Sequence, residues 1–144
     1  MTAKQYLSNY KRIEGKYKTA LEDYRNIENE MVSIKSPSFE ERVQTSAKND
    51  PIGEIVVKLE TEKGKIGMDI VKFRTQMINI RNQIEAMDKV DNDYYVILLL
   101  KYVLYKDWKF ICDSMSVSRT QANRVHGLAL KEFDRIFSEN YEQK

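Results

Sequence analysis

A seven-residue repeat runs through the first part of the chain and constrains its fold more than any other feature. Apolar and aromatic residues recur from Tyr6 to Ile34 at alternating spacings of four and three. The two rows are Tyr6, Ile13, Ala20, Ile27 and Ile34, and Tyr10, Tyr17, Tyr24 and Met31. This spacing places the side chains on one stripe of an α-helix, and Thr2 and Gln5 have the spacing of an N-terminal capping box. The pattern predicts a long amphipathic helix from about Ala3 to Ile34.

A second seven-residue repeat follows residues 35–51, which are rich in Ser, Thr and Asn and predict a linker. Asp50 has the place of an N-cap and Pro51 that of the first helical residue. The rows are Ile52, Leu59, Ile66, Phe73, Ile80 and Met87, and Val56, Lys63, Ile70, Met77 and Ile84, with Gly64 and Gly67 predicting a bend or weak packing. Neither helix can bury its stripe alone. We therefore expect a long antiparallel, coiled-coil-like hairpin, or pairing with a second copy.

The composition supports an all-α fold and excludes several classes of site. Five glycines and two prolines are too few for a loop-rich β fold. A single cysteine, Cys112, and a single histidine, His126, exclude an internal disulfide and a multi-histidine metal centre. The N-terminus has no apolar segment of a signal peptide, and the longest apolar run, 96–100, is too short to span a bilayer. We expect a soluble, cytoplasmic protein without a cofactor, a membrane partner or an enzymatic activity.

From residue 91 the periodicity shortens, which divides the chain into residues 1–90 and 91–144. The pattern predicts helices over 92–105, over 108–115 behind an Asp107 cap, and from Arg119 to about Ser138. Ser118 and Gln121 predict a second capping box after a turn at 116–117. The predicted inward residues of the last helix are Ala122, Val125, Leu128, Ala129, Phe133, Ile136 and Phe137. A short helix, a polar turn and an N-capped helix are typical of a helix-turn-helix DNA-binding domain.

The exposed N-terminal positions of that last helix, Ser118 to Phe137, are the candidate DNA-binding site. Arg can bind guanine with two hydrogen bonds, Asn and Gln can pair with adenine, and a helix N-terminus favours a phosphate. The candidate residues are Ser118, Arg119, Thr120, Gln121, Asn123 and Arg124. An ordinary polar helix face is the alternative interpretation. We expect Trp108 and Cys112 to be core residues, and His126 to contact phosphate or to be solvent-facing or internally satisfied.

Residues 91 to 137 resemble region four of bacterial sigma factors, the module that binds the promoter −35 element. The resemblance lies in Val117-Ser118-Arg119, Val125, Ala129-Leu130-Lys131 and Phe133. The whole chain is similar to small phage proteins of the RinA/ArpU-type late-transcription regulators. That resemblance implies base contacts by Arg119, Thr120 and Arg124, and places Gln121 and Asn123 nearer phosphates. Gln121 and Asn123 stand where sigma factors often carry basic residues.

Charge favours an assembly of more than one copy. Residues 92–144 hold eight Lys and Arg against seven Asp and Glu, so one copy lacks a strongly basic footprint. Two copies held by the hairpin would raise the effective concentration of the second DNA-binding element. We therefore expect a homodimer or higher oligomer that binds double-stranded DNA and contacts RNA polymerase. The expected function is a phage activator of late genes; the alternatives are a polymerase- or sigma-binding adaptor and a small terminase-like packaging protein.

Overall fold

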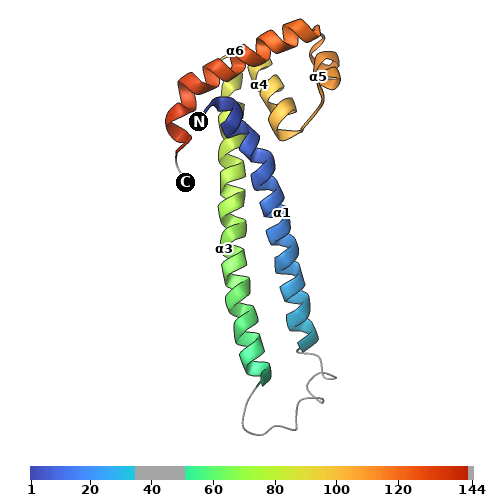
Figure 1. Ribbon diagram of the computed structural model, residues 1–144, viewed down its shortest axis with the longest axis vertical. Helices are drawn as coiled ribbons and strands as arrows, with labels where there is room; N and C mark the ends of the chain where they lie inside the picture. Colours follow the sequence, from blue (N-terminus) through green and yellow to red (C-terminus); the bar gives the residue numbers. More distant parts are fainter. Residues whose placement is uncertain (35–50, 143–144) are drawn as a thin grey trace. The chain divides into compact units, whose positions relative to one another are not determined.

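The computed structural model describes residues 1–34 and 51–142 of the chain. Its elements are α1 (Ala3–Ile34), α3 (Pro51–Ala86), the 3-10 helix η1 (Met87–Lys89), α4 (Asn92–Leu98), the π-helix η2 (Leu99–Val103), α5 (Trp108–Met115), α6 (Arg119–Phe137) and the 3-10 helix η3 (Ser138–Asn140) (Figure 1). The described residues contain no strand, so the predicted all-α class is confirmed. The predicted cap Asp50 and the predicted linker up to that residue lie outside the described residues.

The ends of the long helices follow the sequence signals. The Thr2 N–H donates to the Gln5 Oε1 at 3.0 Å and the Gln5 N–H donates to the Thr2 Oγ1 at 3.3 Å, which completes the predicted capping box. Helix α3 begins at Pro51, as predicted, because proline has no N–H to lose at the first helical position. It continues as one α-helix through Gly64 and Gly67. A Cβ at residue 67 would lie 3.7 Å from the Cε2 of Tyr24, whereas a Cβ at residue 64 would meet nothing within 4 Å.

The described residues form two compact units that divide the long helices between them. Unit 1 comprises Met1–Glu14 and Thr75–Lys144, and unit 2 comprises Gly15–Arg74. The first turns of α1 and the last turns of α3 thus belong to the same compact unit as α4, α5 and α6. The division by function predicted at residue 90 stays a prediction.

In unit 2, α1 and α3 pack antiparallel through their heptad stripes. Ile27, Met31 and Ile34 near the end of α1 form a core with Leu59 near the start of α3, and Ile52, Val56 and Ile66 pack against it. Lys63 interrupts this stripe, but its Nζ lies 3.4 Å from the Glu28 Oε1 and 5.2 Å from the centre of the Tyr24 ring. The long side chain therefore covers apolar surface while its charge is paired.

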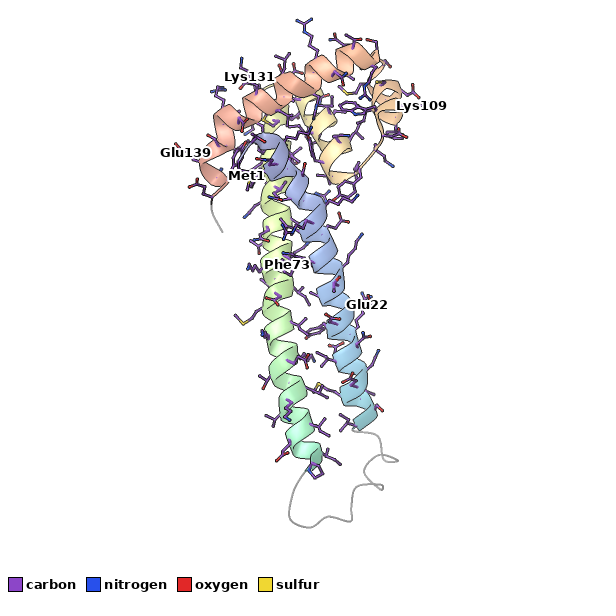
Figure 2. All side chains as sticks on the ribbon, in the orientation of Figure 1. Met1, Glu22, Phe73, Lys109, Lys131 and Glu139 are labelled. Carbon is purple, nitrogen blue, oxygen red and sulfur yellow. The ribbon has the colours of Figure 1, made fainter. Side chains whose placement is uncertain are left out.

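Further along unit 2, the tyrosine row of α1 contacts cations of α3 rather than a purely apolar seam. The Arg74 guanidinium lies over the Tyr17 ring at 5.9 Å from its centre. In the opposite direction, the Lys16 Nζ lies 6.0 Å from the centre of the Phe73 ring, which sits on α3 (Figure 2). Cation–π pairs explain how a stripe with so many tyrosines packs against this helix.

In unit 1, the start of α1 packs on α6 and the end of α3. Phe133 of α6 is fully buried, and its ring lies 6.0 Å from that of Tyr6 in α1 and 4.9 Å from that of Phe137. Tyr141, after η3, is also buried and stacks on Tyr6 with ring centres 4.6 Å apart. The other large side chains that are fully buried are Leu7, Ile84, Met87, Ile97, Leu98 and Ile111. This aromatic core ties both chain termini of the described part to α6.

The helix predicted over 92–105 changes from an α-helix to a π-helix in its C-terminal part. It is capped by Asp91, whose side chain accepts from the Asp93 N–H, and it is α-helical only to Leu98. Residues Leu99–Val103 form a π-helix, in which the Leu104 N–H donates to the Leu99 carbonyl at 3.0 Å. Tyr105 then ends the helix with a left-handed φ of 55°. The predicted helix is therefore present from Asn92 to Val103, but its second part is a π-helix.

The predicted inward face of α6 is correct for most positions. Ala122, Val125, Ala129 and Phe133 are buried and Phe137 is half-buried. Leu128 and Ile136 are exposed by 42% and 39%, so their assignment to the core was wrong. Leu128 precedes Ala129 by one residue, and one residue turns an α-helix by about 100°, which takes Leu128 to the edge of the buried face. At the last turn, Phe137 and Tyr141 pack on Phe133 instead of Ile136.

Candidate nucleic-acid interface

A sharp turn between α5 and α6 fixes the start of the candidate helix. The Asp107 side chain caps α5 by accepting from the Phe110 N–H at 2.8 Å. Ser116 ends α5 in the left-handed conformation, with φ 56° and ψ 45°, and the Val117 N–H donates to the Cys112 carbonyl at 3.1 Å. The Ser118 Oγ then caps α6 by accepting from the Gln121 N–H at 3.1 Å. Both caps and the turn therefore form at the predicted residues.

The outward face of α6 presents a row of exposed residues at helical spacing. Thr120, Arg124, Gly127 and Lys131 follow one another at steps of four, three and four, opposite the buried positions 122, 125, 129 and 133. Figure 2 labels Lys131 on α6. A Cβ at residue 127 would meet nothing within 4 Å. The row thus combines hydrogen-bonding and cationic side chains with Gly127, whose missing side chain lets another molecule approach the helix backbone.

The candidate site residues are all exposed, but they are not equivalent. Thr120, Asn123 and Arg124 lie along or beside the outward row. Ser118 and Gln121 meet in the cap, where the Ser118 Oγ accepts the Gln121 N–H. Arg119 lies with its guanidinium 4.1 Å from the centre of the Trp108 ring. This cation–π contact with Trp108 restrains the guanidinium near the N-terminus of α6.

A cluster of side chains around His126 joins η2, α5 and α6. The sequence analysis did not predict this cluster. The His126 Nε2 lies 2.8 Å from the Tyr102 hydroxyl, and the imidazole meets the Trp108 ring edge-on at 5.3 Å between centres. The Lys101 Nζ lies over the Trp108 ring at 4.8 Å from its centre. The π-helix sets Lys101 and Tyr102 toward α5 and α6, and no residue pattern announces a π-helix. Of the three interpretations given for His126, the structure shows the internally satisfied one. Trp108 and Cys112, which were expected in the core, are only half-buried.

The cluster holds His126 in its neutral form. Burial, and then the positive charges of Lys101, Lys4 and Arg119, lower the pKa of His126 from 6.5 to about 4. Burial also raises the pKa of Tyr102 to about 12. Both groups are therefore uncharged near neutral pH. Lys4 of α1 is thus close enough to His126 for its charge to disfavour protonation of the imidazole.

This pKa predicts a pH dependence of stability. The folded protein binds the His126 proton more weakly than the unfolded chain, so its contribution to stability is complete above pH 6.5 and is lost as the pH falls toward 4. Because the ring is only half-buried, we expect a loss of about 1–2 kcal/mol over that range. Urea unfolding of wild type and His126→Gln at several pH values measures the difference, which isolates this group from the carboxylates. Parallel curves for the two proteins would contradict the prediction.

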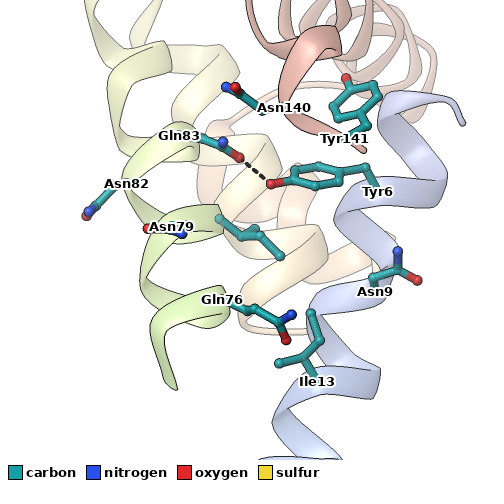
Figure 3. A pocket seen from close by; sticks show the side chains of 10 residues that line it. Tyr6, Asn9, Ile13, Gln76, Asn79, Asn82, Gln83, Asn140 and Tyr141 are labelled. Carbon is teal, nitrogen blue, oxygen red and sulfur yellow. Dashed lines mark hydrogen bonds between the residues drawn. The ribbon is translucent and has the colours of Figure 1, made fainter. Parts of the chain in front are cut away.

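A separate pocket of about 500 Å³ lies in unit 1 between α1, α3 and η3. Its lining includes six carboxamide side chains, from Asn9, Gln76, Asn79, Asn82, Gln83 and Asn140, and none of its lining residues is charged. Tyr6 forms one side, and Figure 3 shows its hydroxyl directed at Gln83, to whose Oε1 it donates at 2.7 Å. Burial raises the pKa of Tyr6. Carboxamides both donate and accept hydrogen bonds, so the pocket suits a neutral polar group such as a peptide unit.

Comparison with protein-family models, with curated proteins and with solved structures found no match to this chain. Within residues 1–34 and 51–142, no three His, Cys, Asp or Glu side chains are grouped so that they could hold a metal ion. None of the helices in the described part has the length and apolar character needed to cross a membrane.

Proposed function

We propose that this protein is a phage-encoded transcription regulator of the RinA/ArpU type that binds promoter DNA through a helix-turn-helix formed by α5 and α6. It acts in the cytoplasm of the bacterial host as an activator of late genes. The observation that carries the proposal is the exposed row of Thr120, Arg124, Gly127 and Lys131 on an N-capped helix that follows a tight turn. A helix of this kind enters the major groove with its outward face.

The proposed roles follow from position and chemistry. Arg124 and Thr120 contact base edges, with Asn123 beside them. Arg119, restrained on Trp108, and the N-terminal N–H groups of α6 bind backbone phosphate. Gly127 allows the DNA backbone to approach α6 closely. Lys131 and Lys4 add nonspecific attraction.

A footprint on DNA from the genome that encodes the chain tests the proposal. We expect a protected site at low salt, and Arg124→Ala should weaken binding to it by about 1–3 kcal/mol, or about 5- to 150-fold, with relaxed preference at the contacted base pair. Arg25→Ala is the matched control, because Arg25 is an exposed arginine of unit 2. The absence of a footprint, or equal binding by wild type and Arg124→Ala, would reject direct DNA reading.

The amide-lined pocket favours a second candidate function, docking on RNA polymerase or a sigma factor. Six carboxamides offer the hydrogen-bonding groups of a peptide backbone without any charge. Binding of purified polymerase in the absence of DNA, with weaker binding by Asn79→Lys and unchanged binding by Arg124→Ala, would support this adaptor function in place of DNA reading.

A further inference from the structure

Helix α3 carries a second heptad stripe on the face that points away from α1. We call it the outer seam: within unit 2 its residues are Val57, Thr61, Gly64, Met68 and Val71, again at alternating steps of four and three. Every one of them is exposed, and none is charged. The exposed fractions of Val57, Met68 and Val71 are 62%, 75% and 65%. Large side chains this exposed, in register over more than three turns, have the pattern of a coiled-coil interface.

The outer seam differs from an ordinary solvent-facing helix surface. The exposed heptad row of α1, for comparison, consists of Lys4, Lys11, Lys18 and Arg25. Charged residues are also frequent on α3 itself, yet none of them stands on the outer seam. The Thr61 hydroxyl donates to the Val57 carbonyl of its own helix at 2.8 Å, so this hydroxyl is satisfied within α3. At residue 64 a Cβ would meet nothing within 4 Å, so a neighbouring helix has room to approach.

We infer that the outer seam binds the same seam of a second copy of this chain, in a parallel two-stranded coiled coil. The flanking charges decide the orientation. In a parallel pair Glu60 lies opposite Lys65 of the second copy, and Lys72 lies opposite the uncharged Gly67, so two attractive pairs form and no like charges meet. An antiparallel pair would align the row Lys58, Lys65 and Lys72 with the same row of the second copy, and like charges would repel.

The composition of the outer seam sets the expected strength of the pairing. Thr61 and Gly64 bury little apolar surface, so the dimer is weak and dissociates on dilution. The pairing itself does not depend on DNA binding. Absence of the dimer, measured without DNA, is therefore distinguishable from absence of DNA binding.

Sedimentation equilibrium of the full chain without DNA tests the inference. Wild type should be a monomer–dimer mixture at micromolar concentration, and Val71→Glu should raise the dimer dissociation constant at least about tenfold, because a carboxylate would have to be buried in the seam. Val32→Glu is the matched control: Val32 is 71% exposed but lies on α1, outside the seam. Circular dichroism of both variants checks that they remain folded. A wild-type monomer, a ring of more than two copies, or equal effects of the two variants would overturn the inference.

Disulfide trapping tests the orientation. In a Cys112→Ser background, Val57→Cys oxidised with copper–phenanthroline should form a disulfide-linked dimer, since equivalent seam residues face each other in a parallel pair. In an antiparallel pair the two residues would be ~25 Å or more apart, by the rise of 1.5 Å per residue. Cross-linking of Val32→Cys in the same background is the control and should stay at the background level. A dimer by sedimentation without cross-linking at residue 57 would overturn the parallel arrangement.

Discussion

Replacing Phe133 with alanine should destabilise the folded protein by about 3–5 kcal/mol, the cost of a large cavity in a packed core. Phe133 is fully buried, and its ring contacts those of Tyr6, Phe137 and Tyr141. The cavity would separate α6 from the start of α1 and from the C-terminal turn. Little relaxation is available, because Tyr141 is already held by a hydrogen bond from its hydroxyl to the Asp134 Oδ1 at 2.7 Å.

Urea unfolding at neutral pH measures this change, and Phe110→Ala is its control. Phe110 is a phenylalanine of α5 that is 45% exposed, with the Lys106 Nζ 4.8 Å from its ring centre. Its replacement should lower the free energy of unfolding by less than about 1 kcal/mol. Similar losses for the two variants would show that Phe133 does not hold unit 1 together.

A fragment of residues 91–144 should fail to fold on its own. Unit 1 needs Met1–Glu14, the end of α3 and η1, which supply the fully buried Leu7, Ile84 and Met87. Without them, the Tyr6 side of Phe133 and much of the core would face water, in a chain too short to compensate. We expect weak helical circular dichroism and no cooperative thermal transition for this fragment.

A shortened chain that keeps both parts of unit 1 is the control for this fragment. Ile13 and Gln76 line the same pocket, so α1 and α3 lie side by side where unit 1 ends. Residues 1–14 joined to 75–144 through a Gly/Ser linker of about four residues should span neighbouring helix axes ~10 Å apart. This shortened protein should unfold cooperatively. A native-like transition in the 91–144 fragment, or none in the joined chain, would contradict the prediction.

The sequence predicted those parts of the fold that depend on local signals. The capping residues Thr2, Asp107 and Ser118 satisfy N–H groups within the next three residues, so their patterns are visible in a short stretch of sequence. Helix periodicity likewise identified the stripes of α1 and α3 and most of the buried face of α6. The bend or weak packing expected at Gly64 and Gly67 does not interrupt the α-helix.

The parts of the fold and of the candidate site that were not predicted depend on contacts between residues far apart in the sequence. The π-helix forms where Lys101 and Tyr102 meet Trp108 and His126, and no local signal encodes that meeting. The stacking of Arg119 on Trp108 and the amide-lined pocket arise in the same way. The outward positions Thr120 and Arg124 of the candidate site could be predicted, because they follow from the phase of one helix. Their role in DNA binding stays a prediction.

The division of α1 and α3 between two compact units has a consequence for the order of folding. Unit 1 is discontinuous in sequence: its two parts are separated by Gly15–Arg74. Closing a loop of that length costs conformational entropy before any contact of unit 1 can compensate for it. The hairpin of unit 2 shortens that loop when it forms, because it brings Glu14 and Thr75 toward each other. We therefore expect unit 2 to form before unit 1 during folding.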